Sequence, residues 1–411
     1  INSNSLSTPV RIVTDSSCCD PGGLSLNQCQ LRGINHIGNL RQVLQLARFS
    51  PQLATGDLAK FYHCYDLTAA DQSLRRLLIP YDWSDPASDF FEAVEAVMPF
   101  GDANASIMAV MGRIKNAEAH SQHLDAVMRD KVMRIYQNHA YVDDILAFAE
   151  PDEDLEAVVA ALTDVAERGG FHFKEWTKTG DKNETKLLGY MWDPAMDVLK
   201  LKLQFNTSKS VRGERIEPNF NLNNLDELVS TKITKRHVLT VQGQFFDPLN
   251  LFSPAVVKLR LLYSQVCMET GHAAWEQEIS QELKIRLQKT LREILPLNGF
   301  AVPRFVGVLK PFCKTGTLVI FCDGSLVAFG AAAYWRPGEL NQSGSAHLIS
   351  STVGICNRKK TTAPRAELLA ACKAKDLYLS VFPSLEAMFT VTSTYLITDS
   401  TIVLAQLQRP G

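Results

Sequence analysis

Apolar positions recur along the chain with two different periods, which alternate from segment to segment. Spacing of three and four residues over 37–49 predicts an amphipathic helix that ends before Ser50-Pro51. The same spacing predicts a long helix over 103–136 and another over 155–168, which Gly169-Gly170 closes. Short apolar runs around these helices are typical of strands, so the first half of the chain is predicted to mix helices with a small sheet.

The least usual pattern is His139–Phe148, where two aspartates interrupt an apolar run. Ala140–Val142 and Ile145–Phe148 are typical of two short buried strands, so Asp143 and Asp144 are expected at the turn of a hairpin. An isolated aspartate pair is usually a plain surface turn. Here the flanks are apolar, and burying two carboxylates is costly unless a cation neutralises them. A divalent metal ion with oxygen ligands does this well.

A further acid, Asp57, stands at the end of a short apolar strand, with the aromatic residue Tyr62 five positions later. Asp57 alone is a weak signal. Two-metal phosphoryl transfer requires carboxylates from separate strands that converge on ions about 3.5–4 Å apart. Asp57 together with the Asp143-Asp144 hairpin therefore favours a site of this kind.

The last third of the chain changes back to a strand pattern after helices predicted over 225–240, 254–266 and 273–295. Asp323 and Asp399 each follow a predicted strand, and Glu367 lies on a helix that begins near residue 365. A lone aspartate at a strand end is usually a turn or cap residue. Three acids that converge on one edge of a sheet instead favour a second metal site.

Composition limits these hypotheses only slightly. The 411 residues, 46% hydrophobic and 21% charged, suffice for two or three cores. A net charge of -2 provides no overall positive field, so any nucleic-acid binding must come from local basic surfaces. The nine cysteines lack metal-binding spacing and indicate reduced thiols of an intracellular protein. Neither a signal peptide nor an apolar run of about 18 residues is present, which predicts a soluble chain.

The motifs stand in the order of a reverse transcriptase followed by RNase H, and Tyr141–Asp144 resembles the catalytic hairpin of reverse transcriptases. The segments Thr234–Leu239 and Phe246–Pro254 resemble the connection region of BEL/Pao-type LTR retrotransposon polyproteins. The opening segments Arg11–Ser17 and Leu24–Asn27 resemble the same family. The similarity extends over nearly the whole chain.

The resemblance implies an α/β (α+β) fold in three regions. Reverse-transcriptase fingers and palm are expected over 1–205, a largely helical thumb and connection region over 206–310, and an RNase H-like mixed-sheet domain over 311–411. The fingers are expected to be incomplete at the N-terminus and the RNase H-like domain truncated at the C-terminus, before its fourth acid. The protease and integrase of the polyprotein are expected outside this fragment.

The resemblance also implies function. The chain would be an RNA-directed DNA polymerase that adds deoxynucleotides to a primer 3′-hydroxyl, with a partial RNase H domain for RNA-DNA hybrids. Asp57 and Asp143 would hold two Mg²⁺ ions, with Mn²⁺ as a substitute, and Asp144 would support them. The first three metal-binding acids of the RNase H part would be Asp323, Glu367 and Asp399.

Five positions would handle the incoming nucleotide by the same resemblance. Arg11 would contact the triphosphate, and the ring of Tyr62 would exclude a ribose 2′-hydroxyl. The Phe100-Gly101 turn would line the nascent base pair. Either Lys174 or Lys178 would lie near the leaving pyrophosphate. One feature departs from the family pattern, because Asp102-Ala103 follows Phe100-Gly101 where the family usually has Ser-Pro.

The expected partners are an RNA template, a DNA primer, the RNA-DNA hybrid and deoxynucleoside triphosphates, and the expected location is the cytoplasm, within virus-like particles. Two alternatives stay open. A catalytically decayed or host-retained copy would bind nucleic acid or partner chains without catalysis. A structural protein would use the same acids only as caps and turns, and its stability would not depend on divalent ions.

Overall fold

The computed structural model describes residues 13–203, 205–206, 210–211, 214–215, 219–271, 274–309, 312–338, 344–357 and 360–408. Arg11 lies outside these residues. The chain divides into two compact units, which are described separately. The first unit comprises Ile1–Asn39, Ala54–Ala147 and Asp154–Trp176, and the second comprises Leu40–Leu53, Phe148–Glu153 and Thr177–Gly411. Among the described residues, no helix combines the length and apolar character that crossing a membrane requires.

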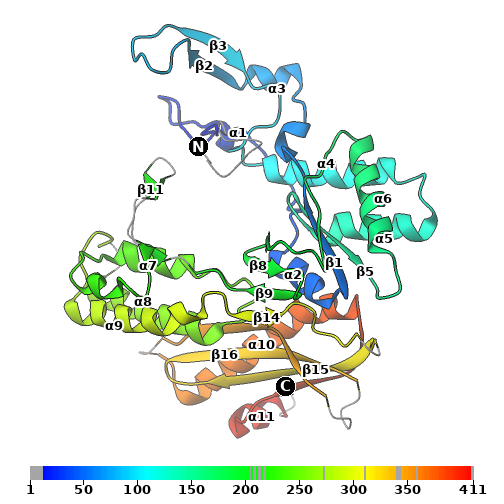
Figure 1. Ribbon diagram of the computed structural model, residues 1–411. Helices are drawn as coiled ribbons and strands as arrows, with labels where there is room; N and C mark the ends of the chain where they lie inside the picture. The colour runs from blue at the N-terminus through cyan, green and yellow to red at the C-terminus, as the bar shows by residue number, and fades with distance from the viewer. Residues whose placement is uncertain are drawn as a thin grey trace. The chain divides into compact units, whose positions relative to one another are not determined.

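The first unit is built around a small sheet that contains β4 (Ala140–Tyr141), β5 (Asp144–Ala149) and β1 (Gln52–Asp57), in that order. β1 and β5 are buried over nearly their whole length, as their apolar runs predicted. Three helices pack against one another beside these strands (Figure 1), namely α4 (Ala105–His120), α5 (Ala126–Asn138) and α6 (Leu155–Arg168).

The prediction of one long helix over 103–136 was wrong, because the chain turns between α4 and α5. Ser121 ends α4, and the Asp125 side chain caps α5 by accepting hydrogen bonds from the backbone N–H groups of Val127 and Met128. The helix predicted after the hairpin is confirmed as α6, with Gly169 at its C-cap.

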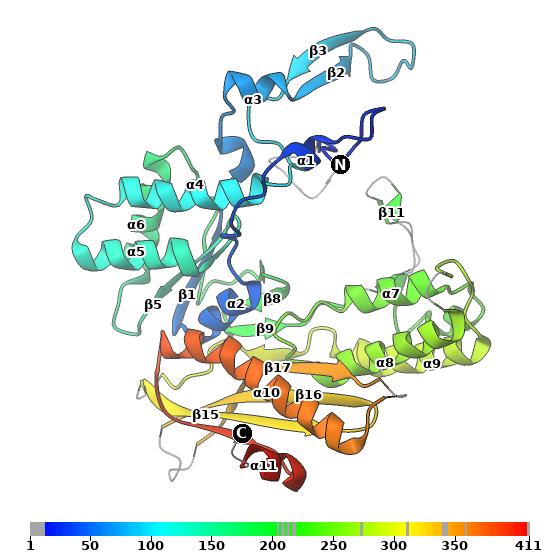
Figure 2. The same ribbon diagram turned by 180° about the vertical axis from the view of Figure 1, so that it is seen from behind.

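A hairpin and several short elements complete the first unit. β2 (Arg76–Pro80) pairs antiparallel with β3 (Phe90–Val94), and the pair is visible at one end of the unit in Figure 2. Residues 13–15 of the opening segment form no strand. The short helices are α1 (Leu26–Cys29), η1 (Phe61–Cys64) and α3 (Ala69–Ser73).

The second unit begins with α2 (Leu40–Phe49), which starts three residues later than predicted. Its first sheet has the order β14-β9-β8-β7. The strands of this part of the chain, within that sheet and outside it, are β6 (Thr177–Lys178), β7 (Thr185–Leu187), β8 (Tyr190–Asp193), β9 (Val198–Lys200), β10 (Phe205–Asn206), β11 (Ser210–Val211), β12 (Glu214–Arg215), β13 (Asn219–Phe220) and β14 (Ala301–Pro303). The helices are η2 (Leu225–Val229), α7 (Lys235–Gln244), α8 (Ser253–Thr270), α9 (Gln281–Ile294) and η3 (Leu295–Leu297).

The rest of the second unit is a four-stranded mixed sheet of order β17-β16-β15-β18. α10 (Ala363–Glu386) packs on one face, and β18 runs parallel to β15 while β16 and β17 are antiparallel to their neighbours. Alternate side chains of β15 are buried, among them Leu318 and Ile320. The remaining elements are β15 (Thr315–Gly324), β16 (Ala328–Pro337), β17 (His347–Ile355), β18 (Thr390–Ile397) and α11 (Thr401–Leu407).

The Phe246–Pro254 motif has a structural explanation, since it joins the helical connection to the edge of this sheet. Asp247 is buried and accepts hydrogen bonds from the backbone N–H groups of Leu251 and Phe252, at 3.0 and 2.7 Å. The backbone N–H of Ser351 on β17 donates to the carbonyl of Leu249 at 3.0 Å. The motif therefore forms a fixed loop that pairs with an edge strand.

Two buried arginines hold the second unit together at another point. The Arg304 guanidinium donates to Asp197 and to the carbonyls of Ala47, Ser50 and Pro51 at the end of α2. The Arg48 guanidinium donates hydrogen bonds to the backbone carbonyls of Leu348 and Ile349 on β17. Segments far apart in the sequence are thus tied by charge-assisted hydrogen bonds.

Candidate active sites

The first candidate site lies where β1 ends beside the β4–β5 hairpin. The backbone N–H of Leu58, directly after Asp57, donates to the carbonyl of Asp143 at 3.0 Å. Asp57 and Asp143 are close enough to share a side-chain hydrogen bond. The carboxyl group of Asp57, at the end of β1, therefore lies beside that of Asp143, in the turn of the β4–β5 hairpin.

The hairpin turn lies one residue earlier than predicted. Val142 and Asp143 form the turn, and Asp144 is already the first residue of β5. Val142 has a φ of 54°, a left-handed conformation that is strained for a β-branched residue. The strain is held in place by Arg113 of α4, whose guanidinium donates to the carbonyls of Val142 and Tyr136.

Arg113 was missed in the sequence, where it is one cation inside an apolar helix. It is fully buried, and burial lowers its pKa to about 10 despite the nearby Tyr65, Tyr136 and Asp143. Its position places a positive charge behind the hairpin. The one signal in the sequence that pointed to Arg113 was a basic residue at a core position of a predicted helix.

The carboxyl groups of Asp143 and Asp144 have raised pKa values. Burial, followed by the charge of Asp57, raises the pKa of Asp143. Burial and the charges of Asp143 and Asp57 raise the pKa of Asp144 to about 7. Lys174 forms an ion pair with Asp57, and its backbone N–H donates to the Asp57 carbonyl at 2.9 Å. One ammonium group thus offsets only part of the repulsion, so the site suits a hard divalent cation.

The predicted nucleotide residues Tyr62, Phe100 and Gly101 lie together in the same unit. The rings of Tyr62 and Phe100 have centroids 4.9 Å apart, and the Tyr62 hydroxyl is 2.8 Å from Ser106 Oγ. Gly101 has a φ of 114°, and a Cβ there would lie 2.1 Å from the carbonyl oxygen of Thr14. Only glycine fits this turn.

The second candidate site contains Asp323, Glu367 and Asp399, from β15, α10 and the segment after β18. Their ligand oxygens lie within 4.8 Å of one another. Among the described residues, no other three potential ligands lie this close together, and this holds also for Asp57, Asp143 and Asp144. Gly324 allows this approach, because a Cβ there would lie 2.4 Å from the backbone of Ala366.

Glu367 is the most informative acid of this second site. Burial and the charges of Asp323 and Asp399 raise its pKa. Its Oε2 atom is buried without a hydrogen-bond partner. Three converging carboxylates and an unpartnered oxygen fit a hard metal ion such as Mg²⁺.

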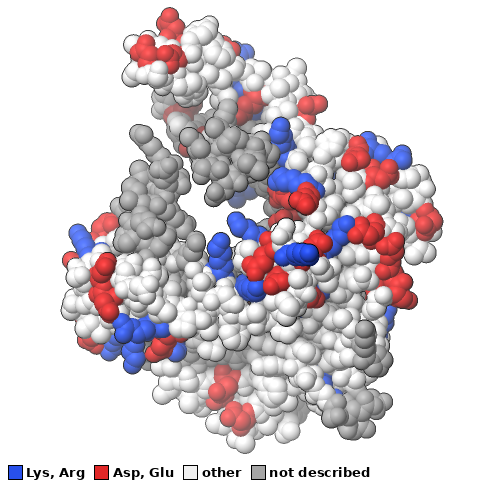
Figure 3. Space-filling view, in the orientation of Figure 1, with Lys and Arg blue, Asp and Glu red and all other residues white. Residues whose placement is uncertain are grey.

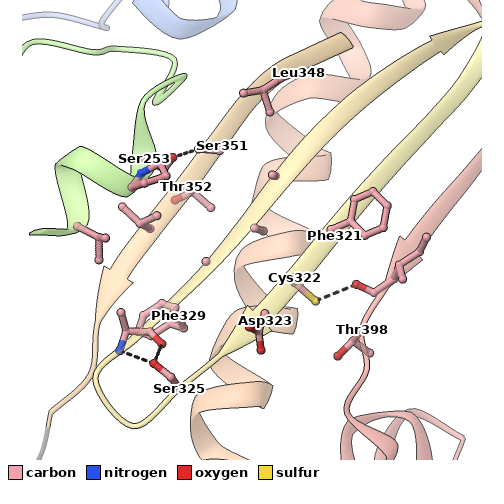
Figure 4. A pocket seen from close by; sticks show the side chains of 18 of the residues that line it. Ser253, Phe321, Cys322, Asp323, Ser325, Phe329, Leu348, Ser351, Thr352 and Thr398 are labelled. Atoms are coloured by element: carbon pink, nitrogen blue, oxygen red, sulfur yellow. Dashed lines mark hydrogen bonds between the residues drawn. The ribbon is translucent and has the colours of Figure 1, made fainter. Parts of the chain in front are cut away.

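A cavity of about 900 Å³, lined in part by Asp323 and Asp399, lies on the sheet face opposite α10. Figure 4 shows Phe321 and Leu348 above the strands and Asp323 at the end of β15. Phe321 is 48% exposed and Ile397 42% exposed. Figure 3 shows few charged side chains on this part of the surface apart from acidic patches. The acids therefore border an apolar surface.

The structure also locates the remaining candidates. Lys178 contacts Asp181 through its backbone N–H, whereas Lys174 contacts Asp57.

All nine cysteines are free thiols, as predicted. Lys235 is buried, and its Nζ atom lies 4.7 Å from the centroid of the Trp275 ring.

Comparisons with known proteins bear on both sites. Residues 234–400 match a family described as the Pao retrotransposon-like RNase H-like domain, and this range contains Asp323, Glu367 and Asp399. None of the curated proteins compared with the chain is significantly similar to it.

Solved structures with the same fold include foamy viral protease-reverse transcriptases. One in complex with double-stranded DNA (described as dRH) is 13% identical, with a TM-score of 0.55 over 94% of this chain and 56% of that chain. One in complex with an RNA/DNA hybrid is 14% identical, with a TM-score of 0.53 over 93% of this chain and 44% of that chain. The chain spans about half the length of these relatives.

A sequence identity of 13–14% to the foamy viral structures shows similarity of fold alone. The match to the Pao family is a similarity of sequence over residues 234–400. Together they confirm the resemblance that the connection motifs suggested. Residues 234–400 are thus similar to the Pao retrotransposon-like RNase H-like domain, and over most of its length the chain shares the fold of the foamy viral protease-reverse transcriptases.

Proposed function

We propose that the chain is the RNA-directed DNA polymerase of a retrotransposon, with fingers and palm over 1–205, thumb and connection over 206–310 and an RNase H-like domain over 311–411. The observation that carries the proposal is the approach of Asp57, at the end of β1, to Asp143, in the β4–β5 turn, where burial and the charge of Asp57 raise the pKa of Asp143. Such a pair is what a two-metal nucleotidyltransferase requires.

Asp57 and Asp143 hold two Mg²⁺ or Mn²⁺ ions in this proposal, and Asp144 supports them. When bound, the ions neutralise charge on the attacking primer oxygen and the leaving pyrophosphate. Arg113 fixes the hairpin that presents Asp143. We assign the basic residue near the pyrophosphate to Lys174 rather than Lys178, because Lys174 already lies on Asp57.

The nucleotide side of the proposal uses Tyr62, Phe100 and Gly101, with Arg11 at the triphosphate. Tyr62 is fixed by Phe100 on its ring and by Ser106 at its hydroxyl, so its ring can act as a rigid wall below the sugar. The chain would act on an RNA template, a DNA primer and deoxynucleoside triphosphates, within cytoplasmic virus-like particles.

For the second site we propose hydrolysis of the RNA strand in an RNA-DNA hybrid. Asp323, Glu367 and Asp399 would hold divalent ions, and water would be the nucleophile. The unpartnered Glu367 oxygen supports this assignment, since a buried carboxylate oxygen without a donor is costly unless an ion binds it.

Primer extension on an RNA template tests the polymerase proposal. The chain should add deoxynucleotides to an annealed DNA primer in the presence of Mg²⁺ or Mn²⁺, and a chelator should stop the reaction. Absence of extension with retained hybrid binding would favour a decayed or host-retained copy. Absence of both, with stability independent of divalent ions, would favour a structural protein.

Tyr62→Ala should permit incorporation of ribonucleotides, because it removes the ring that excludes the 2′-hydroxyl. The measurement is the ratio of kcat/KM for deoxynucleotides and ribonucleotides, which should fall by about 10–100-fold. Tyr81→Ala is the control, since Tyr81 is exposed on the hairpin after β2. An unchanged ratio with lost stability would mean that Tyr62 is a plain core residue.

Metal binding at the polymerase site should release protons near pH 6 but hardly at pH 8, because Asp144 has a pKa of about 7 and must ionise to help hold a cation. The raised pKa stabilises the metal-free fold below about pH 4, and this contribution is lost as the pH rises through about 7. Calorimetry in buffers of different ionisation enthalpy measures the release. Asp144→Asn should reduce it, and equal release in both proteins would contradict the assignment.

A further inference from the structure

Asp102, the residue that departs from the family's Ser-Pro pattern, is buried at the centre of a polar cluster. Its carboxylate accepts hydrogen bonds from Ser16 Oγ at 2.6 Å and Gln30 Nε2 at 2.9 Å. It also accepts from Arg75 Nε and Nη2, at 3.1 and 2.6 Å. The Asp102 side chain is 2% exposed and that of Arg75 is 9% exposed. A turn acid would usually be solvated, so this one has a structural partner set.

The cluster joins three segments of the first unit. Ser16 and Gln30 come from the segment before α2, Arg75 directly precedes β2, and Asp102 follows the Phe100-Gly101 turn. Burial opposes the charge of Asp102, but hydrogen bonds from Ser16, Arg75 and Gln30 outweigh it and hold its pKa below the ordinary value. The carboxylate is therefore ionised, and removing a partner would leave a buried charge.

A second contact fixes the same turn from its other end. Asn27 Nδ2 donates to the Gly101 carbonyl at 3.0 Å, and the backbone N–H of Ala103 donates to Asn27 Oδ1 at 2.7 Å. Gly101 itself lies against the Thr14 carbonyl. The turn thus has little freedom to move away from the 14–30 segment.

The turn carries Phe100, whose ring packs on Tyr62. We propose that Asp102 is a positioning residue, which ties the Phe100-Gly101 turn to Ser16, Gln30 and Arg75 and so sets nucleotide affinity and sugar selectivity through Tyr62. This inference rests on the proposed polymerase function. A Ser-Pro pair has no carboxylate for Arg75, so the ionic tie belongs to this chain's version of the turn.

The test compares Asp102→Asn and Arg75→Met with the wild-type chain in primer extension. Asn keeps the shape but carries no charge to pair with Arg75, and its amide places an N–H donor where one carboxylate oxygen accepts hydrogen bonds. The KM for deoxynucleotides should rise by about 10–100-fold with a smaller change in kcat, since misplacement of a wall by about 1 Å costs that much. Discrimination against ribonucleotides should fall as well. The double variant should be no worse than either single variant, because both remove one interaction.

Glu92→Gln is the matched control. It breaks the Arg76–Glu92 ion pair, which lies next to Arg75 but is exposed, and it should leave KM and selectivity unchanged. Hydrogen exchange adds a readout that needs no activity. The amide of Ala103 and amides of the 14–30 segment should exchange faster in Asp102→Asn, while the Leu146 amide of β5 stays protected.

The outcomes separate the two proposals. A wild-type chain that extends no primer would overturn the polymerase function, and the exchange comparison would still decide whether Asp102 fixes the turn. Exchange at Ala103 equal to wild type, or KM and selectivity equal to the Glu92→Gln control, would overturn the role of Asp102. Loss of protection at Leu146 would mean general unfolding of Asp102→Asn. The same comparison of exchange, KM and selectivity in Arg75→Met would then decide the role of Asp102.

Discussion

Replacing Asp143 by asparagine is expected to lower the rate of primer extension by about 10³-fold, equal to about 4 kcal/mol of lost transition-state stabilisation. The change removes a metal ligand at the turn while keeping the side-chain volume. It should also raise the free energy of unfolding near pH 8, because burial and Asp57 disfavour the ionised form of Asp143 in the fold. That gain should shrink as the pH falls below the ordinary aspartate pKa of about 3.9, where the wild-type side chain becomes protonated in both states.

Asp130→Asn is the control for this result, since it removes an exposed acid of α5 in the same unit. Extension and stability should both stay near wild type. If Asp143→Asn extends a primer as fast as Asp130→Asn does, Asp143 holds no essential metal ion. A loss of stability in Asp143→Asn at pH 8 would show that its carboxylate is satisfied by protein groups instead.

Replacing Arg304 by methionine should lower the free energy of unfolding by about 3–5 kcal/mol, the cost of leaving one partner of a buried ion pair behind. The Arg304 side chain is 0% exposed, and its removal strands Asp197 and the carbonyls of Ser50 and Pro51. Methionine fills part of the volume but donates no hydrogen bond. Urea unfolding can be followed by the fluorescence of Trp192, which lies beside Arg304.

The matched control is Arg292→Met. Its ion pair with Asp226 has the same 2.6 Å separation as the Arg304–Asp197 pair, but both side chains are more than half exposed. Solvent screening should limit its loss to less than about 1 kcal/mol. Similar losses in the two variants would mean that burial adds nothing to the Arg304 cluster.

The acids and their strands were predictable because the information is local. An apolar run followed by a carboxylate predicts β1 with Asp57 and β15 with Asp323, and the structure has both. The helix that carries Glu367 was visible for the same reason. Tertiary packing only had to bring these strand and helix ends together.

Other features were not predictable from local pattern. Val142 adopts a positive φ against its own preference, so the turn lies one residue from the expected place. Arg113 and Asp102 depend on partners distant in sequence, Val142 for the first and Ser16 for the second. Charged residues in these positions are usually solvated, and only the fold reveals that they are buried.

Metal-directed cleavage of the protein backbone tests the central assignment most directly. Fe²⁺ bound in place of Mg²⁺ generates hydroxyl radicals with ascorbate and peroxide, which cut the chain close to the ion. We expect cuts beside Asp57 and beside Asp143, which excess Mg²⁺ suppresses and Asp143→Asn abolishes. Cuts near Asp323, Glu367 and Asp399 should persist in that variant as an internal control. Cleavage at those three acids, without any beside Asp57 and Asp143, would contradict the proposed polymerase site.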